Sequence, residues 1–430
     1  MSKPVIGFAG MTHLGVVSTA AALARGFDVV GFDEDVALVS RLRDGEPPVL
    51  EAGLPEILQK HAAHAAFTSR MEDLSRCDLV YISTDVPTDA AGTSELGAIR
   101  RLIASVGRVL GSQAILTVLC QVPPGFTRNL DTPRARLYYQ VETLVFGRAV
   151  ERALRPERFV VGCADPKQPL PAALREFLAA FECPVLPMGY ESAELAKIAI
   201  NCCLVSSIST ANTLAELCEQ IGAVWSDIVP ALRLDPRIGK HAYLAPGLGI
   251  AGGNLERDLA TIVALGGQSG IDTGLVKAWL ANSRHRRDWA LDRIRKAVLR
   301  DKPDAVVAVW GLAYKENTHS VKNSPSLATI RQMADVSLRL YDPVVPASAA
   351  GHPSAVAATS AIDAVSGADA LMILTPWPQF REAAPRKVRE AMRGRVVLDP
   401  YAVLDQGDAV AAGLELHVLG RSPLGGSKSS

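Results

Sequence analysis

The sequence has no excess of charge of either sign and no long apolar run. Lysine plus arginine number 45 and aspartate plus glutamate also number 45, so the formal net charge is +0 at pH 7. This balance excludes a basic field for nucleic acid and a polybasic membrane anchor. No uninterrupted apolar run reaches the ~18 residues of a membrane span. An anionic ligand must therefore be held by a local site.

Paired cysteine motifs are also lacking. The seven cysteines are odd in number and include no CxxC pair, so neither a disulfide framework nor a metal site is supported. The first apolar segment, Val5–Ala9, runs directly into a glycine-rich turn without a charged leader or cleavage site before it. This order argues against a signal peptide, and we expect a cytoplasmic protein with free thiols.

The length of 430 residues favours two or three domains. Residues 1–185 and 300–430 alternate short apolar segments with amphipathic ones, whereas residues 190–290 read as mostly helical and open on the long run Ser192–Gly222. The expected strands are Val5–Phe8, Asp28–Phe32, Leu79–Ser83, Ala114–Leu119, Arg158–Val161, Ala305–Trp310, Ser337–Tyr341, Ala370–Leu374 and Arg395–Leu398.

This alternation of strands and helices indicates parallel, doubly wound sheets. The predicted fold class is α/β, with two doubly wound Rossmann-like domains joined by a long central helix and a helical region. The Gly/Ser-rich tail from Arg421 is predicted to be disordered.

The first expected strand leads into a nucleotide-binding turn. Its residues are Gly10, Met11, Thr12, His13, Leu14 and Gly15, and the helical segment Val16–Arg25 follows. Glycine lets the chain approach a pyrophosphate, and the helix offers its N-terminal amides. Asp33, at the end of the second strand, can accept from the ribose hydroxyls, which favours NAD over NADP. Thr12 replaces the usual middle glycine, which either shifts the dinucleotide or adds a hydrogen bond; a turn without a ligand is the alternative.

From this point the chain resembles the UDP-glucose/GDP-mannose dehydrogenase family over nearly its whole length. The matching segments are the Gly10–Gly15 turn with Asp33, Gly45–Leu54, Gln121–Thr127, Glu194–Asn201, Asp235–Gly239, Pro246–Gly253, Gly311–Thr318, Tyr341–Pro343 and Thr375–Trp377. The resemblance implies a dimer built on the central helix, so that residues 190–290 form a dimerisation domain and residues 300–430 bind the nucleotide sugar. It also implies oxidation of a nucleotide sugar at C6 with NAD.

Family members oxidise a primary alcohol to a carboxylate in two hydride transfers, and a cysteine thiolate captures the intermediate aldehyde. The resemblance places Lys197 against the alkoxide that forms at C6, with Asn201 and Asp258 holding that oxygen and a water. Lys197 and Asn201 stand four residues apart, so both project from one face of a helix. A positive charge beside a forming oxyanion lowers the barrier. These residues suit the first oxidation.

The positions tied to the second oxidation are altered. The resemblance puts Asn254 at the position of the nucleophilic cysteine and Gln121 at that of a catalytic threonine. It keeps the first family glutamate as Glu142 but replaces the second by Phe146. Cys120 is the only thiol worth testing as a substitute, and a buried core thiol is the simpler interpretation.

The resemblance also implies the residues that bind cofactor and substrate. Gln121, Pro87 and Lys322 join the turn and Asp33 at NAD, and Lys322 keeps the charge of a family arginine but not its bidentate fork. Ser320 stands where the family usually has an aspartate, and Asp399–Tyr401 stands where it usually has an arginine, which suggests an unusual sugar or nucleotide. The expected substrate ligands are Glu142, Lys197, Asn201, Arg237 (reaching across from the neighbouring subunit), Tyr243, Gly249, Gly253, Tyr314 and Lys315.

Three hypotheses remain open. In the first, oxidation stops after two electrons and releases an aldehyde or a ketone. In the second, a hydrated aldehyde donates the second hydride, so that a uronate forms without a thioester. In the third, the protein binds NAD or a nucleotide sugar without turnover, as a regulatory partner; the retained Lys197 and Asp258 argue against this one.

Overall fold

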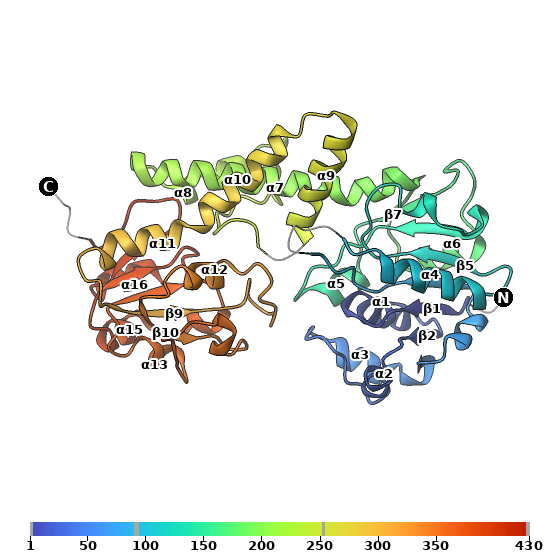
Figure 1. The fold of residues 1–430 in the computed structure, drawn as a ribbon, viewed down its shortest axis with the longest axis horizontal. Coiled ribbons are helices and arrows are strands. Elements are labelled where there is room, and N and C mark those ends of the chain that lie inside the picture. The colour runs from blue at the N-terminus through green and yellow to red at the C-terminus, as the bar shows by residue number, and fades with distance from the viewer. Residues whose placement is uncertain (1–2, 90–93, 252–253, 427–430) are drawn as a thin grey trace. The chain divides into compact units, whose positions relative to one another are not determined.

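The structure is a computed structural model that describes residues 3–89, 94–251 and 254–426. It divides into two compact units, Met1–Ile200 and Asn201–Ser430. The predicted α/β class is confirmed, because each unit contains a sheet with helices on its faces (Figure 1).

The first unit is built on an eight-stranded sheet with the order β3-β2-β1-β4-β5-β6-β7-β8. Its strands are β1 (Ile6–Ala9), β2 (Val29–Phe32), β3 (Ala65–Thr68), β4 (Leu79–Ile82), β5 (Ile115–Val118), β6 (Leu137–Gln140), β7 (Phe159–Cys163) and β8 (Val185–Gly189). Neighbouring strands run parallel, as predicted, except β6 and β7, which pair antiparallel. The central strands are buried on both faces, which is typical of doubly wound sheets.

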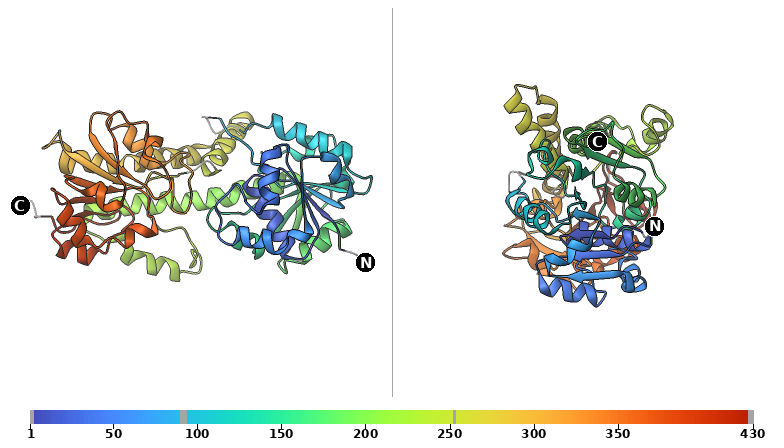
Figure 2. Two further views of the ribbon diagram at one scale, coloured as in Figure 1. Left: turned by 90° about the horizontal axis from the view of Figure 1, so that it is seen from below. Right: turned by 90° about the vertical axis from the view of Figure 1, so that its right-hand side faces the viewer.

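Helices lie on both faces of this sheet (Figure 2). They are α1 (His13–Ala24), α2 (Val36–Arg43), α3 (Leu54–Lys60), α4 (Gly97–Val109), α5 (Ala149–Leu154), α6 (Ala172–Ala179) and the start of α7 (Tyr190–Ile221), with short 3-10 turns η1 (Ala62–His64), η2 (Met71–Arg76), η3 (Thr127–Asn129) and η4 (Arg134–Arg136). Helix α1 contacts both α3 and α5. The N-terminal turn of α1 is thereby fixed against two other helices.

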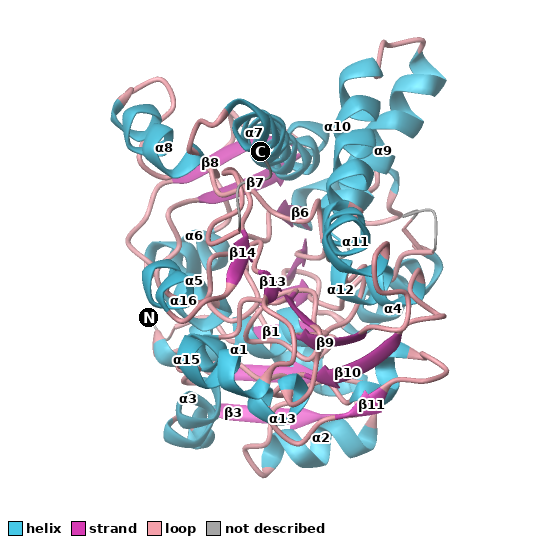
Figure 3. Ribbon diagram, turned by 90° about the vertical axis from the view of Figure 1, so that its left-hand side faces the viewer, coloured by secondary structure: helices cyan, strands magenta, loops and turns pink. Residues whose placement is uncertain are grey.

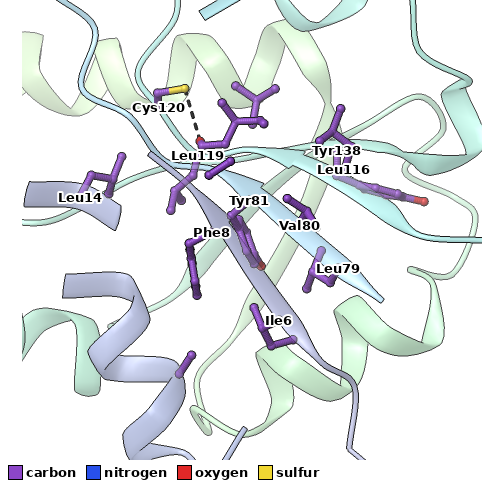
Figure 4. Close-up of a cluster of buried hydrophobic side chains, with 14 of the residues drawn as sticks. Ile6, Phe8, Leu14, Leu79, Val80, Tyr81, Leu116, Leu119, Cys120 and Tyr138 are labelled. Atoms are coloured by element: carbon purple, nitrogen blue, oxygen red, sulfur yellow. Dashed lines mark hydrogen bonds between the residues drawn. The ribbon is translucent and has the colours of Figure 1, made fainter. Parts of the chain in front are cut away.

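The core of the first unit lies around β1, β4 and β5. Phe8 and Tyr81 stack with their ring centroids 5.3 Å apart, and the Tyr81 hydroxyl donates to Gln140. Figure 4 shows Cys120 in this cluster beside Leu119, and its thiol donates to the carbonyl of Ile82. Cys120 is therefore a core residue at the end of β5, as the sequence suggested.

Helix α7 confirms the predicted long central helix and begins two residues earlier, at Tyr190. Within the described ranges it is the one helix long and apolar enough to cross a membrane. However, Glu194, Asn201 and Asn212 on this helix are buried and hydrogen-bonded to other parts of the chain. Buried, satisfied polar groups of this kind are typical of a helix inside a folded protein.

The second unit contains a six-stranded, wholly parallel sheet with the order β11-β10-β9-β12-β13-β14 (Figure 3). Its strands are β9 (Val306–Trp310), β10 (Ser337–Tyr341), β11 (Val356–Ala357), β12 (Ala370–Ile373), β13 (Val396–Leu398) and β14 (Glu415–His417). Its helices are α8 (Trp225–Leu234), α9 (Asn254–Ser269), α10 (Gly274–Arg287), α11 (Trp289–Ile294), α12 (Pro325–Arg331), α13 (Ala361–Val365), α14 (Pro378–Arg381), α15 (Pro385–Ala391) and α16 (Gln406–Ala411), with a π-helical turn η5 (Arg295–Leu299) and a 3-10 turn η6 (Ala347–Ala350). Helices α11 and α12 lie on one side of the sheet and α15 and α16 on the other (Figure 3).

The described part of the tail, residues 421–426, makes tertiary contacts, so the prediction of a disordered tail is wrong for these residues, and residues 427–430 lie outside the described residues. Arg421 donates to Gln406, Ser422 donates to the carbonyl of Glu219, and Leu424 forms a bridge with Leu416. The Gly/Ser composition of the tail does not reveal these tertiary contacts.

Candidate functional site

The turn after β1 can be formed only by glycine at two of its positions. Gly10 has φ +99°, and a Cβ there would lie 2.7 Å from the Thr84 side chain. A Cβ on Gly15 would lie 1.8 Å from the carbonyl oxygen of Gly10. The close approach of these two residues places the free amides of the first turn of α1 at the end of β1. That arrangement fits the pyrophosphate of a dinucleotide.

The Thr12 side chain ties this turn to the end of β4. Its hydroxyl accepts a hydrogen bond from the amide of Asp85 at 3.0 Å and lies 3.4 Å from the carbonyl of Ser83. Where the motif usually has glycine, the threonine therefore adds hydrogen bonds within the protein. Leu14 is buried, and the carbonyl of Pro87 accepts from the amide of Glu95.

Replacing Thr12 by alanine is expected to weaken NAD binding about threefold to tenfold, because a hydrogen bond contributes about 0.5–1.5 kcal/mol net. The lost bonds hold the turn against β4, so the free protein should sample other turn conformations. Thr12→Ser, which keeps the hydroxyl, is the control and should bind NAD like the wild type. Calorimetric titration measures both, and equal affinity of the alanine variant would contradict this role of Thr12.

Asp33 follows β2 and lines a hollow with Gly10, Thr84, Ala98 and Leu102. One carboxylate oxygen of Asp33 accepts from the amide of Met11 at 2.7 Å, and the other accepts from the amide of Asp35 at 3.0 Å. The carboxylate is thus oriented by the turn itself. A fixed acid at this place fits the ribose of NAD.

The first unit brings Lys197 and Glu142 together. The Lys197 ammonium lies 3.5 Å from the Glu142 carboxylate, and the two side chains are only 11% and 14% exposed. Glu142 follows β6 and accepts from the amide of Leu144. The Glu142 carboxylate therefore holds the Lys197 ammonium in a place that is largely shielded from water. A positive charge in such a place stabilises a forming oxyanion strongly.

Glu194 holds the loop that contains Gln121, a role that the sequence did not assign. Its buried carboxylate accepts from the amides of Gly125 at 2.5 Å and Thr127 at 2.8 Å. Burial raises the pKa of Glu194 above its ordinary value, while these hydrogen bonds oppose the shift. An acid three residues before Lys197 in an apolar helix was the available signal.

In the second unit, Asn201 donates to the Asp258 carboxylate at 2.5 Å. Asp258 is buried in α9, and the other carboxylate oxygen lies 3.6 Å from the guanidinium of Arg257. Asn254 is the first residue of α9 and is exposed. Two residues further on, Glu256 pairs with Arg287 at 2.9 Å and contacts Asn323. The helix start around Asn254 is thus held by an ion pair and by the Asn201–Asp258 pair.

The glycine loop before α9 is constrained by packing. Gly249 has φ +80°, and a Cβ there would lie 2.4 Å from the carbonyl of Ser283. The amides of Gly247 and Ile250 already donate to Asn212 and Ser283. These two amides are therefore used within the chain, although the resemblance implied that Gly249 and Gly253 of this loop bind the substrate. Gly253 lies outside the described residues.

The remaining predicted ligands of the second unit lie at or near its surface. Arg237 pairs with Asp235 at 2.6 Å while its side chain stays 88% exposed, and Tyr243 is half exposed. The Lys315 ammonium lies 5.7 Å from the ring centre of Tyr314. Lys322 is exposed.

The segment Asp399–Tyr401, where the resemblance to the family is lost, begins in a buried turn. Asp399 accepts from the amides of Val403 and Leu404, both at 2.9 Å. Burial raises the pKa of Asp399 to about 6. Tyr401 lies near the glycine loop, because a Cβ on Gly247 would stand 4.0 Å from its ring.

Protonation of Asp399 is expected to stabilise the fold as the pH falls. A folded-state pKa of about 6, against an ordinary aspartate pKa of 3.8, means that the folded chain takes up a proton at a higher pH than the unfolded chain does. The contribution grows from pH ~6 down to pH ~4 and is on the order of 3 kcal/mol. Asp399→Asn should lose this pH dependence, whereas Asp405→Asn, at an exposed helix N-cap, should keep it. Melting temperatures measured across this pH range would contradict the assignment if those of Asp399→Asn and of the wild type changed with pH in the same way.

The two thiols that stand next to predicted site residues in the sequence, Cys120 and Cys202, are poor nucleophiles. Burial raises the pKa of Cys120 well above its ordinary value. Burial and the nearby carboxylate of Asp258 also raise the pKa of Cys202. Neither thiol is a good source of thiolate at neutral pH.

Three domain profiles of one family match the chain in order. The UDP-glucose/GDP-mannose dehydrogenase family is matched by its NAD binding domain at residues 5–182, its central domain at 191–284 and its UDP binding domain at 308–406. The chain is 30% identical over 447 residues to the UDP-glucose 6-dehydrogenase of Pseudomonas aeruginosa, with 98% of each chain covered. It is 27% identical to UDP-glucose 6-dehydrogenase TuaD of Bacillus subtilis, over 99% of this chain and 95% of that one.

Solved structures show the same fold. A UDP-glucose dehydrogenase from Pyrobaculum islandicum superposes with a TM-score of 0.83 at 25% identity, covering 94% of this chain and 95% of that chain. A UDP-D-ManNAc dehydrogenase from Pyrococcus horikoshii has a TM-score of 0.83 at 22% identity, covering 97% and 99%. The second likeness concerns the fold alone.

The match to an NAD binding domain agrees with the glycine geometry of the Gly10–Gly15 turn and with Asp33 at the end of β2. NAD is therefore the cofactor, and the predicted family resemblance is confirmed. The chain belongs to the UDP-glucose/GDP-mannose dehydrogenase family of NAD-dependent nucleotide-sugar dehydrogenases.

Proposed function

We propose that this dehydrogenase oxidises a hydroxyl of a nucleotide sugar, at C6, by two electrons and releases the aldehyde. The observation that carries the proposal is a contrast between two sets of residues. The Lys197–Glu142 and Asn201–Asp258 pairs are present, whereas Asn254 stands at the start of α9 where relatives would need a thiol. The groups for alcohol oxidation are kept, and the group for aldehyde capture is missing.

The retained pairs support the first oxidation in the following way. The Gly10–Gly15 turn would hold NAD, which would supply the hydride acceptor for the reacting carbon. Lys197, oriented by Glu142, stabilises the alkoxide as the hydroxyl loses its proton. Asn201 and Asp258, hydrogen-bonded to each other, hold the water that receives this proton. One hydride and one proton leave the alcohol, and an aldehyde results.

The second oxidation has no corresponding support. An aldehyde has no hydroxyl on the carbon that must lose hydride, and a thiolate adduct is the usual way to create one. The amide of Asn254 cannot form such an adduct. Phe146 and Gln121 occupy the other positions that the family resemblance connects with thioester chemistry. A hydrated aldehyde held by Asp258 is the alternative route, and it would give a uronate.

We further propose that the active form is a cytoplasmic homodimer. Helices α7 and α8 expose several large apolar side chains, among them Leu217, Ile221 and Leu234. Exposed apolar side chains gathered on one region mark a protein contact surface. The exposed Arg237, held by Asp235, would serve the substrate bound to the second copy. Sedimentation analysis tests the dimer.

One experiment separates the possible reactions. The purified protein and NAD are incubated with a panel of nucleotide sugars. The NADH formed per sugar is quantified, and the products are identified by mass spectrometry. The proposal predicts one NADH for each sugar and an aldehyde. Two NADH and a uronate would favour the hydrate route instead. Tight binding without any NADH would indicate a regulatory binder and overturn the enzymatic proposal.

A further inference from the structure

The imidazole of His13 connects the cofactor turn to the loop between β6 and α5, which contains Glu142 and Phe146. His13 is the first residue of α1, and its side chain is only 8% exposed. Its Nε2 lies 2.9 Å from a carboxylate oxygen of Glu51. Its ring stacks on Phe146, with centroids 4.2 Å apart and planes inclined by 15°. The first turn of the cofactor-binding helix therefore touches two residues from different parts of the chain.

Glu51 also binds the loop between β6 and α5. Besides His13, its buried carboxylate accepts from the amides of Gly147 at 2.8 Å and Ala149 at 3.1 Å. Ala149 is the first residue of α5, so the carboxylate also satisfies free amides of a helix start. A buried carboxylate with its partners in place fixes their relative positions. The loop is anchored at Gly147.

The opposite end of this loop carries the acid of the proposed site. Glu142 stands four residues before Phe146 and forms the ion pair with Lys197. The segment from Glu142 to Phe146 thus runs from the catalytic lysine to the cofactor turn. A movement of α1 at His13 must be taken up within these few residues or passed on to Glu142.

We propose that the His13–Phe146 stack couples the cofactor turn to the position of Glu142, so that NAD binding orders the acid that holds Lys197. The identity of the chemistry at Lys197 rests on the proposed function, but the coupling itself requires only NAD. Phe146 is a positioning residue, and an aromatic ring is needed because the contact is a stack. The family's glutamate at this position could not stack on His13.

Hydrogen exchange measures the coupling directly in the full-length protein, with NAD as the probe. NAD should slow exchange at residues 10–16 and also at residues 142–149. In Phe146→Ala, protection at 10–16 should remain, while protection at 142–149 should fall about fivefold or more, as is usual when coupled sites are disconnected. Phe146→Tyr keeps the aromatic ring and should retain the protection of residues 142–149, whereas Phe146→Leu should lose it.

Val145 offers a matched control, because it is the adjacent residue and is exposed to the same extent, 39% against 38% for Phe146. Val145→Ala should leave both protections unchanged. Equal protection of residues 142–149 in Phe146→Ala and wild type would overturn the coupling, as would protection confined to residues 10–16 in the wild type. Absence of protection at both segments in the wild type would instead refute the cofactor site, and the coupling with it.

Discussion

Replacing Lys197 by methionine is expected to lower kcat about 10²- to 10³-fold, the usual cost of removing a group that stabilises a forming oxyanion. Lys197 lies in a largely dry place and is held 3.5 Å from Glu142. Water molecules entering in its place would have to reorient as the oxyanion forms, whereas the fixed charge of Lys197 does not. NAD affinity should stay within about twofold of the wild type, because Lys197 is not part of the cofactor turn.

The same substitution leaves Glu142 without its cation, and this can reduce stability. The double variant Lys197→Met/Glu142→Gln removes both charges and should regain the stability lost in the single variant, but not its activity. Lys277→Met, at an exposed position on α10, is the control for loss of a positive charge. Wild-type kcat in Lys197→Met, measured by NADH formation, would remove Lys197 from the mechanism.

Asn254→Cys is expected to change the stoichiometry of the reaction. A cysteine as the first residue of α9 would stand at a helix N-terminus, which lowers the pKa of a thiol. Its thiolate would form a C–S bond to the aldehyde, and the resulting alcohol would lose a proton to water and a hydride to a second NAD. We therefore expect a second NADH per active site and a thioester between Cys and substrate.

The thioester should persist, because Gln121 and Phe146 occupy the positions that the family resemblance connects with its hydrolysis. Intact-protein mass spectrometry would show the acyl adduct in Asn254→Cys and not in Asn254→Ala. The seven native thiols make the unmodified wild type an essential second control. If the wild type formed a uronate with two NADH, Asn254 would not be the residue that stops the reaction.

The central strands and the long helix could be predicted because their signals are local. Strands β1, β4, β9 and β12 are short, apolar and bounded by turns, and α7 has a long apolar repeat without proline or glycine. Five strands were not predicted, namely β3, β6, β8, β11 and β14. Strand β3 contains alanine, β8 contains proline and β11 has only two residues. What makes them strands is the neighbour with which each one pairs.

The site residues, like the strands, could be predicted only where the signal is local in the sequence. The spacing of Lys197 and Asn201 predicts that they share a helix face, and the offset of Asp33 predicts its place at the end of β2. The fold confirms that Asp33 follows β2. No spacing predicts that Glu194 holds the Gln121 loop, since the two are brought together only by folding.

By itself the sequence determined the α/β class, the family, the cofactor and the residue types available for chemistry, because periodicity, turn glycines and motif spacing are properties of neighbours along the chain. Only the tertiary structure decided that Glu142 meets Lys197, that Asp258 meets Asn201 and that Phe146 stacks on His13. Such contacts depend on how sheets and helices close around a core, where burial and hydrogen-bond satisfaction select partners from distant parts of the chain.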